Sequence, residues 1–355
     1  MCDLPQLEQK KRGSVKKIPV ADAVGMVLGH DITEIRRDEF KGSAFKRGHI
    51  VKKEDIGHLQ RLGKEYLFVI DIGDDEMHED VAAHALSAAL MGEGVAVQGE
   101  PNEGKINIVS ERDGLLRINT DALLEFNLLG DVMCATLHNN TMVKKGQIVA
   151  ATRAIPLIVK RRVIEDAAII TKHSGKIVEV QKLRAPRVGL VITGNEVYYG
   201  RIQDTFASII KKKITDFNGE ILGLYYAPDN EQMIADRLKE LIEAGADLLI
   251  TTGGMSVDPD DVTRFAIRSL GATEMTYGSP VLPGAMFLVA YIHTIPILGV
   301  PACGMYHKTT VLDLIFPRIL AGEKIGRREL AGLGHGGLCL HCSECRYPVC
   351  PFGKG

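Results

Sequence analysis

The sequence predicts an α/β protein whose second half is built on a doubly wound parallel sheet. Between residues 186 and 325, apolar runs of strand length alternate with amphipathic stretches of helix length. The expected strand 248–252 begins with an apolar run and is followed by a glycine pair, as expected where a buried parallel strand meets a ligand-binding loop. Loops that follow parallel strands open at one edge of the sheet, so we expect the functional site there.

The elements of this region follow in order along the chain. Strands are expected at 188–193, 221–226, 248–252 and 295–300, and helices at 204–217, 229–244, 261–270 and 308–320. Asp229, with Gln232 three residues later, predicts a capping box at the start of the second helix. The apolar stretch 281–303 is interrupted by Pro, Gly and His, which favours two short buried strands over a membrane span.

The remaining chain divides into regions that differ in their sequence patterns. Short strand-like runs among Gly-Lys turns, with one helix expected at 78–91, predict an α+β region of one or two subdomains. A Gly-rich lead-in at 332–337 predicts that the C-terminal tail is a unit of its own. The expected organisation is a polar N-terminal segment, the α+β region, the α/β domain and a Cys-rich metal-binding tail, at 1–17, 18–185, 186–325 and 326–355.

Composition excludes several classes of function. The formal net charge is −2 and there is no Trp, so neither general attraction to nucleic acid nor a base-stacking platform is expected. The N-terminus lacks the apolar core of a secretory signal, and we expect neither a membrane span nor export. Four of the seven Cys crowd into 339–350, which fits a reducing, cytoplasmic compartment.

Polar loops follow three of the expected strands. They span 193–205, 227–230 and 253–261. Each loop precedes a helix, so free backbone N–H groups can face an anion. The loops also carry carboxylates, which suit metal-assisted or proton-transfer chemistry. The sequence therefore predicts a cleft for a phosphate-bearing heterocycle.

The motifs in these loops resemble those of the molybdopterin-binding domain used in molybdenum-cofactor biosynthesis, over residues 187–320. The matching pieces are Thr193-Gly194-Asn195-Glu196, Asp204-Thr205, Pro228-Asp229-Asn230, and Gly253-Gly254-Met255-Ser256 with Asp261. Their order and spacing agree with the family's pattern, in which Asp is usual where this chain has Asn195.

The resemblance implies a role for each matched residue. It implies that molybdopterin is cradled by Gly253, Gly254 and Ser256 and contacted by Thr193, Gly194, Asp204 and Thr205. It implies an acidic site for insertion of molybdate, formed by Glu196, Asp229 and Asp261, with Mg²⁺ as a candidate ion. Asp204 and Asp229 also suit plain helix capping. The resemblance further implies a homodimer, with a molybdoenzyme or another cofactor-biosynthesis protein as partner.

One departure from the family leaves the type of function open. Ala285 stands where the molybdenumtransferases carry a Lys in a Pro-Gly-Lys-Pro loop, so one anion contact is missing. The leading hypothesis is a transferase-like enzyme that inserts metal or matures the cofactor. The alternative is a non-catalytic carrier, storage or sensor protein, and a nucleotide-processing enzyme on a related domain is a third.

The tail carries a second motif. Cys339, Cys342, Cys345 and Cys350 follow the pattern C-x2-C-x2-C-x4-C-P. Four thiolates in twelve residues can surround one ion or one cluster. The pattern is similar to the ferredoxin motif with one added residue, which favours [4Fe–4S], while Zn remains open. The other interpretation is a reduced tail without metal.

Overall fold

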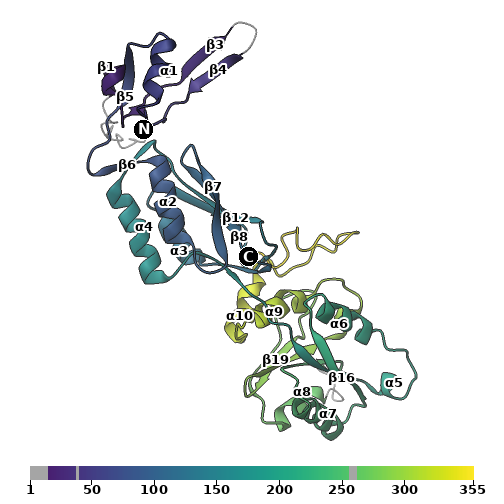
Figure 1. Cartoon of the computed structure of the whole chain (residues 1–355). Helices are drawn as coiled ribbons and strands as arrows, with labels where there is room; N and C mark the ends of the chain where they lie inside the picture. Colours follow the sequence, from purple (N-terminus) through teal and green to yellow (C-terminus); the bar gives the residue numbers. More distant parts are fainter. Residues whose placement is uncertain (1–14, 37–39, 256–261) are drawn as a thin grey trace, which may run out of the picture. The chain divides into compact units, whose positions relative to one another are not determined.

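The computed structural model describes residues 15–36, 40–255 and 262–355. The chain forms two compact units, shown with their elements in Figure 1. The first comprises the chain up to residue 111 with 118–137 and 145–179, and the second comprises 112–117, 138–144 and 180–355.

The first unit begins with a small β-rich part. Its elements are β1 (Val15–Pro19), η1 (Val20–Asp22), β2 (Val27–Leu28), β3 (Ile32–Arg36), β4 (Phe40–Phe45), α1 (Asp55–Arg61) and β5 (Tyr66–Ile70). The sheet β1-β5-β2 and the hairpin β3-β4 are antiparallel. Leu59 of α1 and Leu67 and Val69 of β5 are fully buried, so this part has a core of its own.

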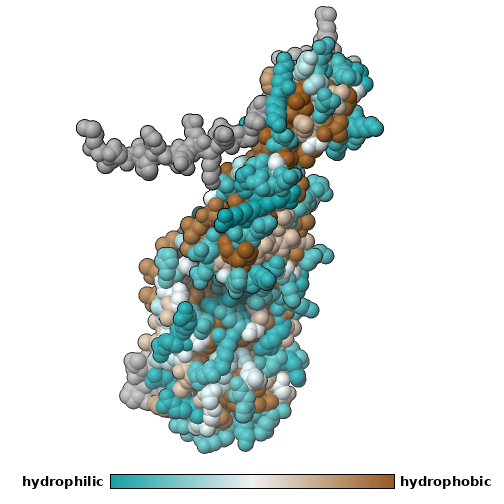
Figure 2. Space-filling model, turned by 90° about the vertical axis from the view of Figure 1, so that its left-hand side faces the viewer, coloured by the Kyte–Doolittle hydropathy of each residue, from teal (hydrophilic) through white to brown (hydrophobic). Residues whose placement is uncertain are grey.

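The first unit continues with an α+β part. Its elements are β6 (Glu76–His78), α2 (Glu79–Leu90), β7 (Val95–Asn102), β8 (Lys105–Ser110), α3 (Thr120–Asn127), β10 (Val132–Thr136), β12 (Ile148–Ala154), β13 (Ile158–Lys160) and α4 (Arg161–Ser174). An antiparallel sheet with the order β10-β12-β8-β7 packs against α2, the helix expected over 78–91. Figure 2 shows hydrophobic residues scattered over a mostly hydrophilic surface on one face of the molecule.

A short three-stranded sheet has the order β11-β9-β14. It consists of β9 (Gly114–Ile118), β11 (Met142–Val143) and β14 (Val178–Gln181). Segments 112–117 and 138–144, which supply most of β9 and all of β11, belong to the second unit.

A six-stranded sheet with the order β16-β15-β17-β20-β19-β18 organises the second unit. Its strands are β15 (Arg187–Thr193), β16 (Glu220–Ala227), β17 (Leu248–Thr252), β18 (Thr273–Tyr277), β19 (Leu288–Ile292) and β20 (Ile295–Val300). The helices are α5 (Asn195–Tyr198), α6 (Phe206–Thr215), α7 (Glu231–Glu243), α8 (Thr263–Ser269), η2 (Ala302–Met305), α9 (Val311–Leu320), α10 (Arg327–Ala331) and η3 (Gly332–Gly334).

The sheet is mixed, which corrects the expectation of a wholly parallel one. Strands β16, β15, β17 and β20 are parallel, but β19 runs antiparallel to β20 and β18 antiparallel to β19. Only His293 and Thr294 connect β19 to β20. A two-residue link can close a hairpin but is too short for the crossover that parallel strands need.

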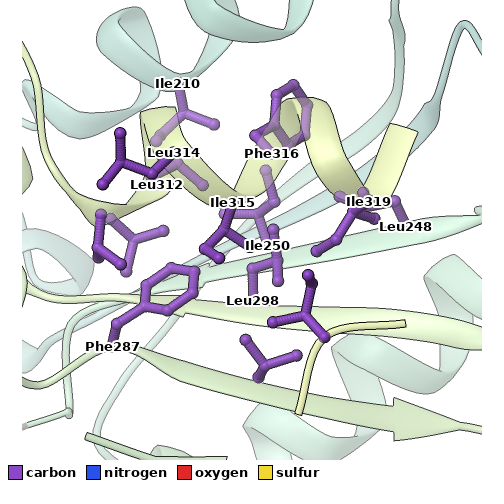
Figure 3. Close-up of a cluster of buried hydrophobic side chains, with 14 of the residues drawn as sticks. Ile210, Leu248, Ile250, Phe287, Leu298, Leu312, Leu314, Ile315, Phe316 and Ile319 are labelled. Carbon is purple, nitrogen blue, oxygen red and sulfur yellow. The ribbon is translucent and has the colours of Figure 1, made fainter. Parts of the chain in front are cut away.

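Helices cover both faces of the sheet because its buried strands alternate their apolar side chains. Leu248 and Ile250 of β17 lie in a core with α6 and α9, as Figure 3 shows, and Leu249 lies in a second core with α7 and α8. Apolar residues on both faces are typical of a parallel strand that is buried from both sides.

The C-terminal tail packs on the α/β domain. Phe352 is 3% exposed within the core shared with α9, and Tyr347 packs against the same core. The Gly-rich lead-in therefore does not separate the tail from the domain. Among the described residues, no helix is both long and apolar enough to cross a membrane.

Candidate functional site

A cleft of about 690 Å³ lies beyond the carboxyl ends of β15, β17 and β20. We call it the strand-end cleft. Its described lining comprises Glu196, Gly253, Gly254, Met255, Leu282, Pro283, Gly284, Ala285, Met286, Pro301, Ala302, Cys303, His307, Leu338 and His341. Its size is that of ordinary small-molecule sites, and its place in the sheet is where α/β proteins bind their ligands.

Gly253 and Gly254 are held in left-handed backbone conformations, with φ of +84° and +55°. A Cβ at Gly253 would collide with the carbonyl oxygen of Thr193, and one at Gly254 would collide with the hydroxyl of Thr263. The packing beneath the loop therefore requires both glycines, and it leaves their backbone facing the cleft. A larger residue at Gly254 would disturb the fold as well as any ligand.

Thr193 supports this loop from below. Its hydroxyl donates to the carbonyl oxygen of Thr252 at 2.8 Å and lies 3.2 Å from the hydroxyl of Thr263. Thr193 is buried and does not belong to the described lining of the cleft. Its side chain thus joins the ends of β15 and β17 to the start of α8.

Gly194 leaves space for Glu196. A Cβ at Gly194 would lie 2.8 Å from a carboxylate oxygen of Glu196, and φ at Gly194 is +136°. Glu196 is exposed and lines the strand-end cleft. It is the one predicted acidic residue that the described part of the chain places in the cleft wall.

Asp229 joins two strand-end loops. The backbone N–H of Asn195 donates to its carboxylate at 3.0 Å, and its own N–H donates to the Asn195 side-chain oxygen at 3.2 Å. The expected capping by Asp229 is wrong, because α7 begins one residue later. Asn230 is the N-cap, and its side chain accepts from the N–H of Met233 at 2.9 Å.

Asp204 precedes Thr205, the N-cap of α6, and its side chain binds the first N–H groups of the helix. Its carboxylate accepts from the N–H groups of Phe206 at 2.7 Å and Ala207 at 3.2 Å. It also accepts from the Tyr226 hydroxyl at 3.0 Å, and burial together with this contact raises the pKa of Tyr226. Thr205 lies with its hydroxyl 3.4 Å from the sulfur of Met305. Neither Asp204 nor Thr205 belongs to the described lining.

Ser256 and Asp261 lie outside the described residues. The described lining of the cleft contains no Lys or Arg, so no permanently positive side chain faces the cleft from these residues. Ala285 is exposed in that wall. Cys303 also lines it, and burial raises the pKa of its thiol.

His307 and His341 are site residues that the sequence patterns did not predict. They supply the only side-chain N–H donors in the described lining of the cleft. Their ring centroids lie 5.2 Å apart. His341 comes from the tail, and its place here follows from tertiary packing that no local motif signals.

The four tail cysteines line a second hollow, of about 300 Å³, which we call the cysteine hollow. Among the described residues, no three His, Cys, Asp or Glu side chains converge closely enough to hold a metal ion. The pKa of Cys345 is lowered by a hydrogen bond with the Thr309 hydroxyl and by one with the Tyr347 backbone. His307 and His341 line this hollow as well as the cleft.

Two parts of the chain match known domain families. Residues 189–321 match a family described as "Probable molybdopterin binding domain", and residues 17–71 match a "Domain of unknown function". The first match covers β15 to α9, with both loops that follow β15 and β17.

Individual proteins match over part of their length. The molybdopterin molybdenumtransferase of Haemophilus influenzae is 30% identical over 159 residues, which cover 42% of this chain and 38% of that protein. A CinA-like protein of Thermosipho melanesiensis is 29% identical over 105 residues, covering 30% of this chain and 26% of that protein. The chain thus spans well under half the length of these relatives.

A solved structure also matches. The molybdopterin biosynthesis enzyme MoaB of Thermus thermophilus is 23% identical, with a TM-score of 0.34, over 39% of this chain and 98% of that one. Because this score is below 0.5, the assignment rests on the domain match and on the strand-end loops. Residues 189–321 of this chain are thus similar to the family described as "Probable molybdopterin binding domain".

Proposed function

We propose that this chain binds molybdopterin in the strand-end cleft and acts in molybdenum-cofactor biosynthesis. The observation that carries the proposal is the position of Gly253 and Gly254, whose packing leaves bare backbone in the wall of a 690 Å³ cleft. Backbone at a strand end can hold a phosphate or a pterin ring closely, since no Cβ intervenes.

The finer function that we propose is insertion of molybdate into molybdopterin. Glu196 supports it, because an exposed carboxylate in the cleft wall can take up or release a proton as oxygen leaves the oxoanion. Asp229 would act indirectly, because its carboxylate accepts a hydrogen bond from the N–H of Asn195 and so holds the loop that carries Glu196. Asp261 and Ser256 complete the proposed site, as the family resemblance implies.

A non-catalytic carrier or sensor is the second candidate. Ala285 favours it, because an alanine in the cleft wall provides no charge for an incoming oxoanion. The two candidates share the ligand and differ in turnover.

We also propose that the tail holds one metal centre, [4Fe–4S] or Zn, through Cys339, Cys342, Cys345 and Cys350. Support comes from the donor set, since all four sulfur-bearing residues line one hollow. Metal binding would have to draw the four side chains inward from their described positions. The alternative for the tail is a reduced segment without metal, held by its packing on the core, to which Tyr347 and Phe352 contribute.

Ala285 offers a direct test of the cleft. Its side chain is exposed there, so a long substituent enters the cleft without replacing a packed group. Ala285→Lys should tighten binding of anionic molybdopterin, and Ala285→Glu should weaken it, each by roughly tenfold. Affinity is measured by anaerobic titration of pterin fluorescence.

Ala244→Glu is the matched control, because Ala244 is exposed at the end of α7 and does not line the cleft. It changes net charge as Ala285→Glu does and should leave the affinity unchanged. Equal affinities in Ala285→Lys and Ala285→Glu would reject this cleft as the binding site. Turnover of molybdate by the wild type decides for the transferase over the carrier.

A further inference from the structure

The strand-end cleft and the cysteine hollow share two walls, and each wall is a segment of the chain that contributes residues to both sites. Residues 301–303 line the cleft, and residues 306–309 of the same segment line the hollow. In the tail, Leu338 lines the cleft and Cys339 lines the hollow. In each wall, residues that line the cleft therefore lie within a few positions of residues that line the hollow.

Backbone hydrogen bonds join the tail wall, at residues 337–339, to Leu282 in the lining of the cleft. The N–H of Leu282 donates to the carbonyl of Gly337 at 2.8 Å, and the N–H of Cys339 donates to the carbonyl of Leu282 at 2.8 Å. These bonds form a parallel bridge between Leu282 and Leu338, both of which line the cleft. Cys339, the first cysteine of the motif, is thus hydrogen-bonded through its backbone to a residue that lines the cleft.

The second wall is fastened in a similar way. Thr309 lies with its hydroxyl 3.4 Å from the sulfur of Cys345. Two residues earlier, the N–H of His307 donates to the carbonyl of Cys303 at 3.2 Å. Because Cys303 lines the cleft, a change of position at Cys345 can be transmitted along this segment.

The two histidines lie where the walls meet. His307 comes from one wall and His341 from the other, and their rings contact each other with centroids 5.2 Å apart. Neither ring donates a hydrogen bond to, or accepts one from, a described side chain or backbone group. The position of each ring in the cleft therefore depends on the position of its own segment.

We propose that a metal bound by the four cysteines orders these shared walls and so raises the affinity of the cleft for molybdopterin. The inference rests on the proposed function, since it needs both ligands. Metal binding would fix residues 338–342, including His341. Molybdopterin would then meet a wall that is already ordered and would lose less conformational entropy on binding. By linkage, molybdopterin must tighten metal binding by the same factor.

The test uses the full-length protein, freed of metal by chelation and then divided, with Zn²⁺ added to one half. Anaerobic titration of pterin fluorescence should give an affinity on the order of tenfold higher in the Zn²⁺-loaded half. His341→Ala should still take up one Zn²⁺ per chain but lose most of this difference. His335→Ala, a tail histidine that lines neither site, should retain it.

Cys342→Ser provides a second route to the same comparison. Cys342 is exposed and lines the hollow but not the cleft. The variant should bind molybdopterin as weakly as the metal-free wild type, with thermal unfolding used to confirm that it is folded.

Failure of the coupling, of the tail metal centre and of the proposed function would each give a different result. Equal molybdopterin affinity with and without Zn²⁺ would overturn the coupling and leave both binding sites standing. A folded wild type that takes up neither Zn²⁺ nor an iron–sulfur cluster would overturn the coupling and the tail centre together. Absence of molybdopterin binding in either state would overturn the proposed function itself.

Discussion

Glu196 combines two properties that the other predicted carboxylates lack in the described structure. It is exposed, and it lines the strand-end cleft. Asp204 instead accepts hydrogen bonds from the first N–H groups of α6, and Asp229 accepts one from Asn195. A carboxylate whose oxygens hold a helix end or a neighbouring loop is less available for proton transfer than one facing a ligand.

We therefore expect Glu196→Gln to lower molybdate insertion by on the order of 10²-fold while molybdopterin affinity changes little. The substitution keeps the shape of the side chain and removes its charge. Single-turnover assays of insertion and fluorescence titration of pterin measure the two effects separately.

Glu231→Gln is the control for this variant. Glu231 is exposed in the first turn of α7 and does not line the cleft. It should match the wild type in both assays. If Glu196→Gln also inserts molybdate at the wild-type rate, Glu196 has no part in proton transfer.

Sequence patterns could place the glycines and Glu196 in the loops that follow two strands, because backbone conformation and loop position are local properties. They could not decide which Asp residues face a ligand. Asp204 and Asp229 each fit a motif and a cap equally, and only the tertiary positions of Tyr226 and Asn195 show where their oxygens are engaged. His307 and His341 carry no motif for this cleft at all.

At the scale of elements, α9 is anchored by a partly buried ion-pair cluster at its carboxyl end. Glu323 accepts from Arg318 at 2.8 and 2.6 Å and from Arg117 at 2.9 Å. Burial by itself would raise the pKa of Glu323, but the hydrogen bonds and charges of the two arginines outweigh it and lower the pKa. The ionised form is therefore the one that stabilises the fold.

Glu323→Gln should lower the free energy of unfolding by about 2 kcal/mol at pH 7. Because the folded pKa is depressed, the contribution of Glu323 is present above the ordinary Glu pKa of about 4.3 and lost as pH falls through the folded pKa. The difference between wild type and variant should therefore shrink below about pH 4. Urea unfolding at several pH values measures it.

The pair Glu274–Lys324 offers a matched comparison. It has a 2.7 Å contact, but its side chains are 57% and 62% exposed. Glu274→Gln should change stability by less than about 0.5 kcal/mol at any pH, as expected of an exposed pair. Equal losses in the two variants would show that burial does not set the strength of the Glu323 cluster.

Alternation of apolar and amphipathic segments predicted four parallel strands and the helices that cover both faces of the sheet. It did not predict the orientation of β19, because an apolar run looks the same in either direction. That orientation follows from the two-residue link to β20, and β18 then adds to the edge in the antiparallel sense.

At the scale of the molecule, the tail shows what local patterns miss. Its glycines predicted a separable unit, yet Phe352 is buried in the core of the α/β domain. The bridge between Leu282 and Leu338 joins residues more than fifty positions apart, which no local motif indicates. The position of the cysteine motif beside the strand-end cleft is therefore a property of the fold alone.

We expect the protein to be at least a dimer, as the family resemblance implies. Large apolar side chains are exposed on the helical part of the first unit, among them Val81, Leu124, Leu128 and Ile169, and hydrophobic residues appear on the surface in Figure 2. A second copy would remove such groups from water. Light scattering at micromolar concentration tests this expectation.

Leu128→Lys should weaken the dimer if this part of the first unit forms the interface. Val349→Lys, at an exposed position in the tail, is the control and should leave the mass unchanged. A wild-type mass of 38.7 kDa, that of one chain, would contradict the expectation.

The central claim is that the strand-end cleft holds molybdopterin, and co-purification tests it most directly. The protein is produced in cells that make molybdopterin, purified anaerobically, desalted and oxidised, and its pterin is identified by fluorescence. We predict a pterin content approaching one per chain in the wild type and a clearly lower content in Ala285→Glu, in line with its weaker binding. No pterin in a folded wild type, or the same amount in both proteins, would contradict the claim.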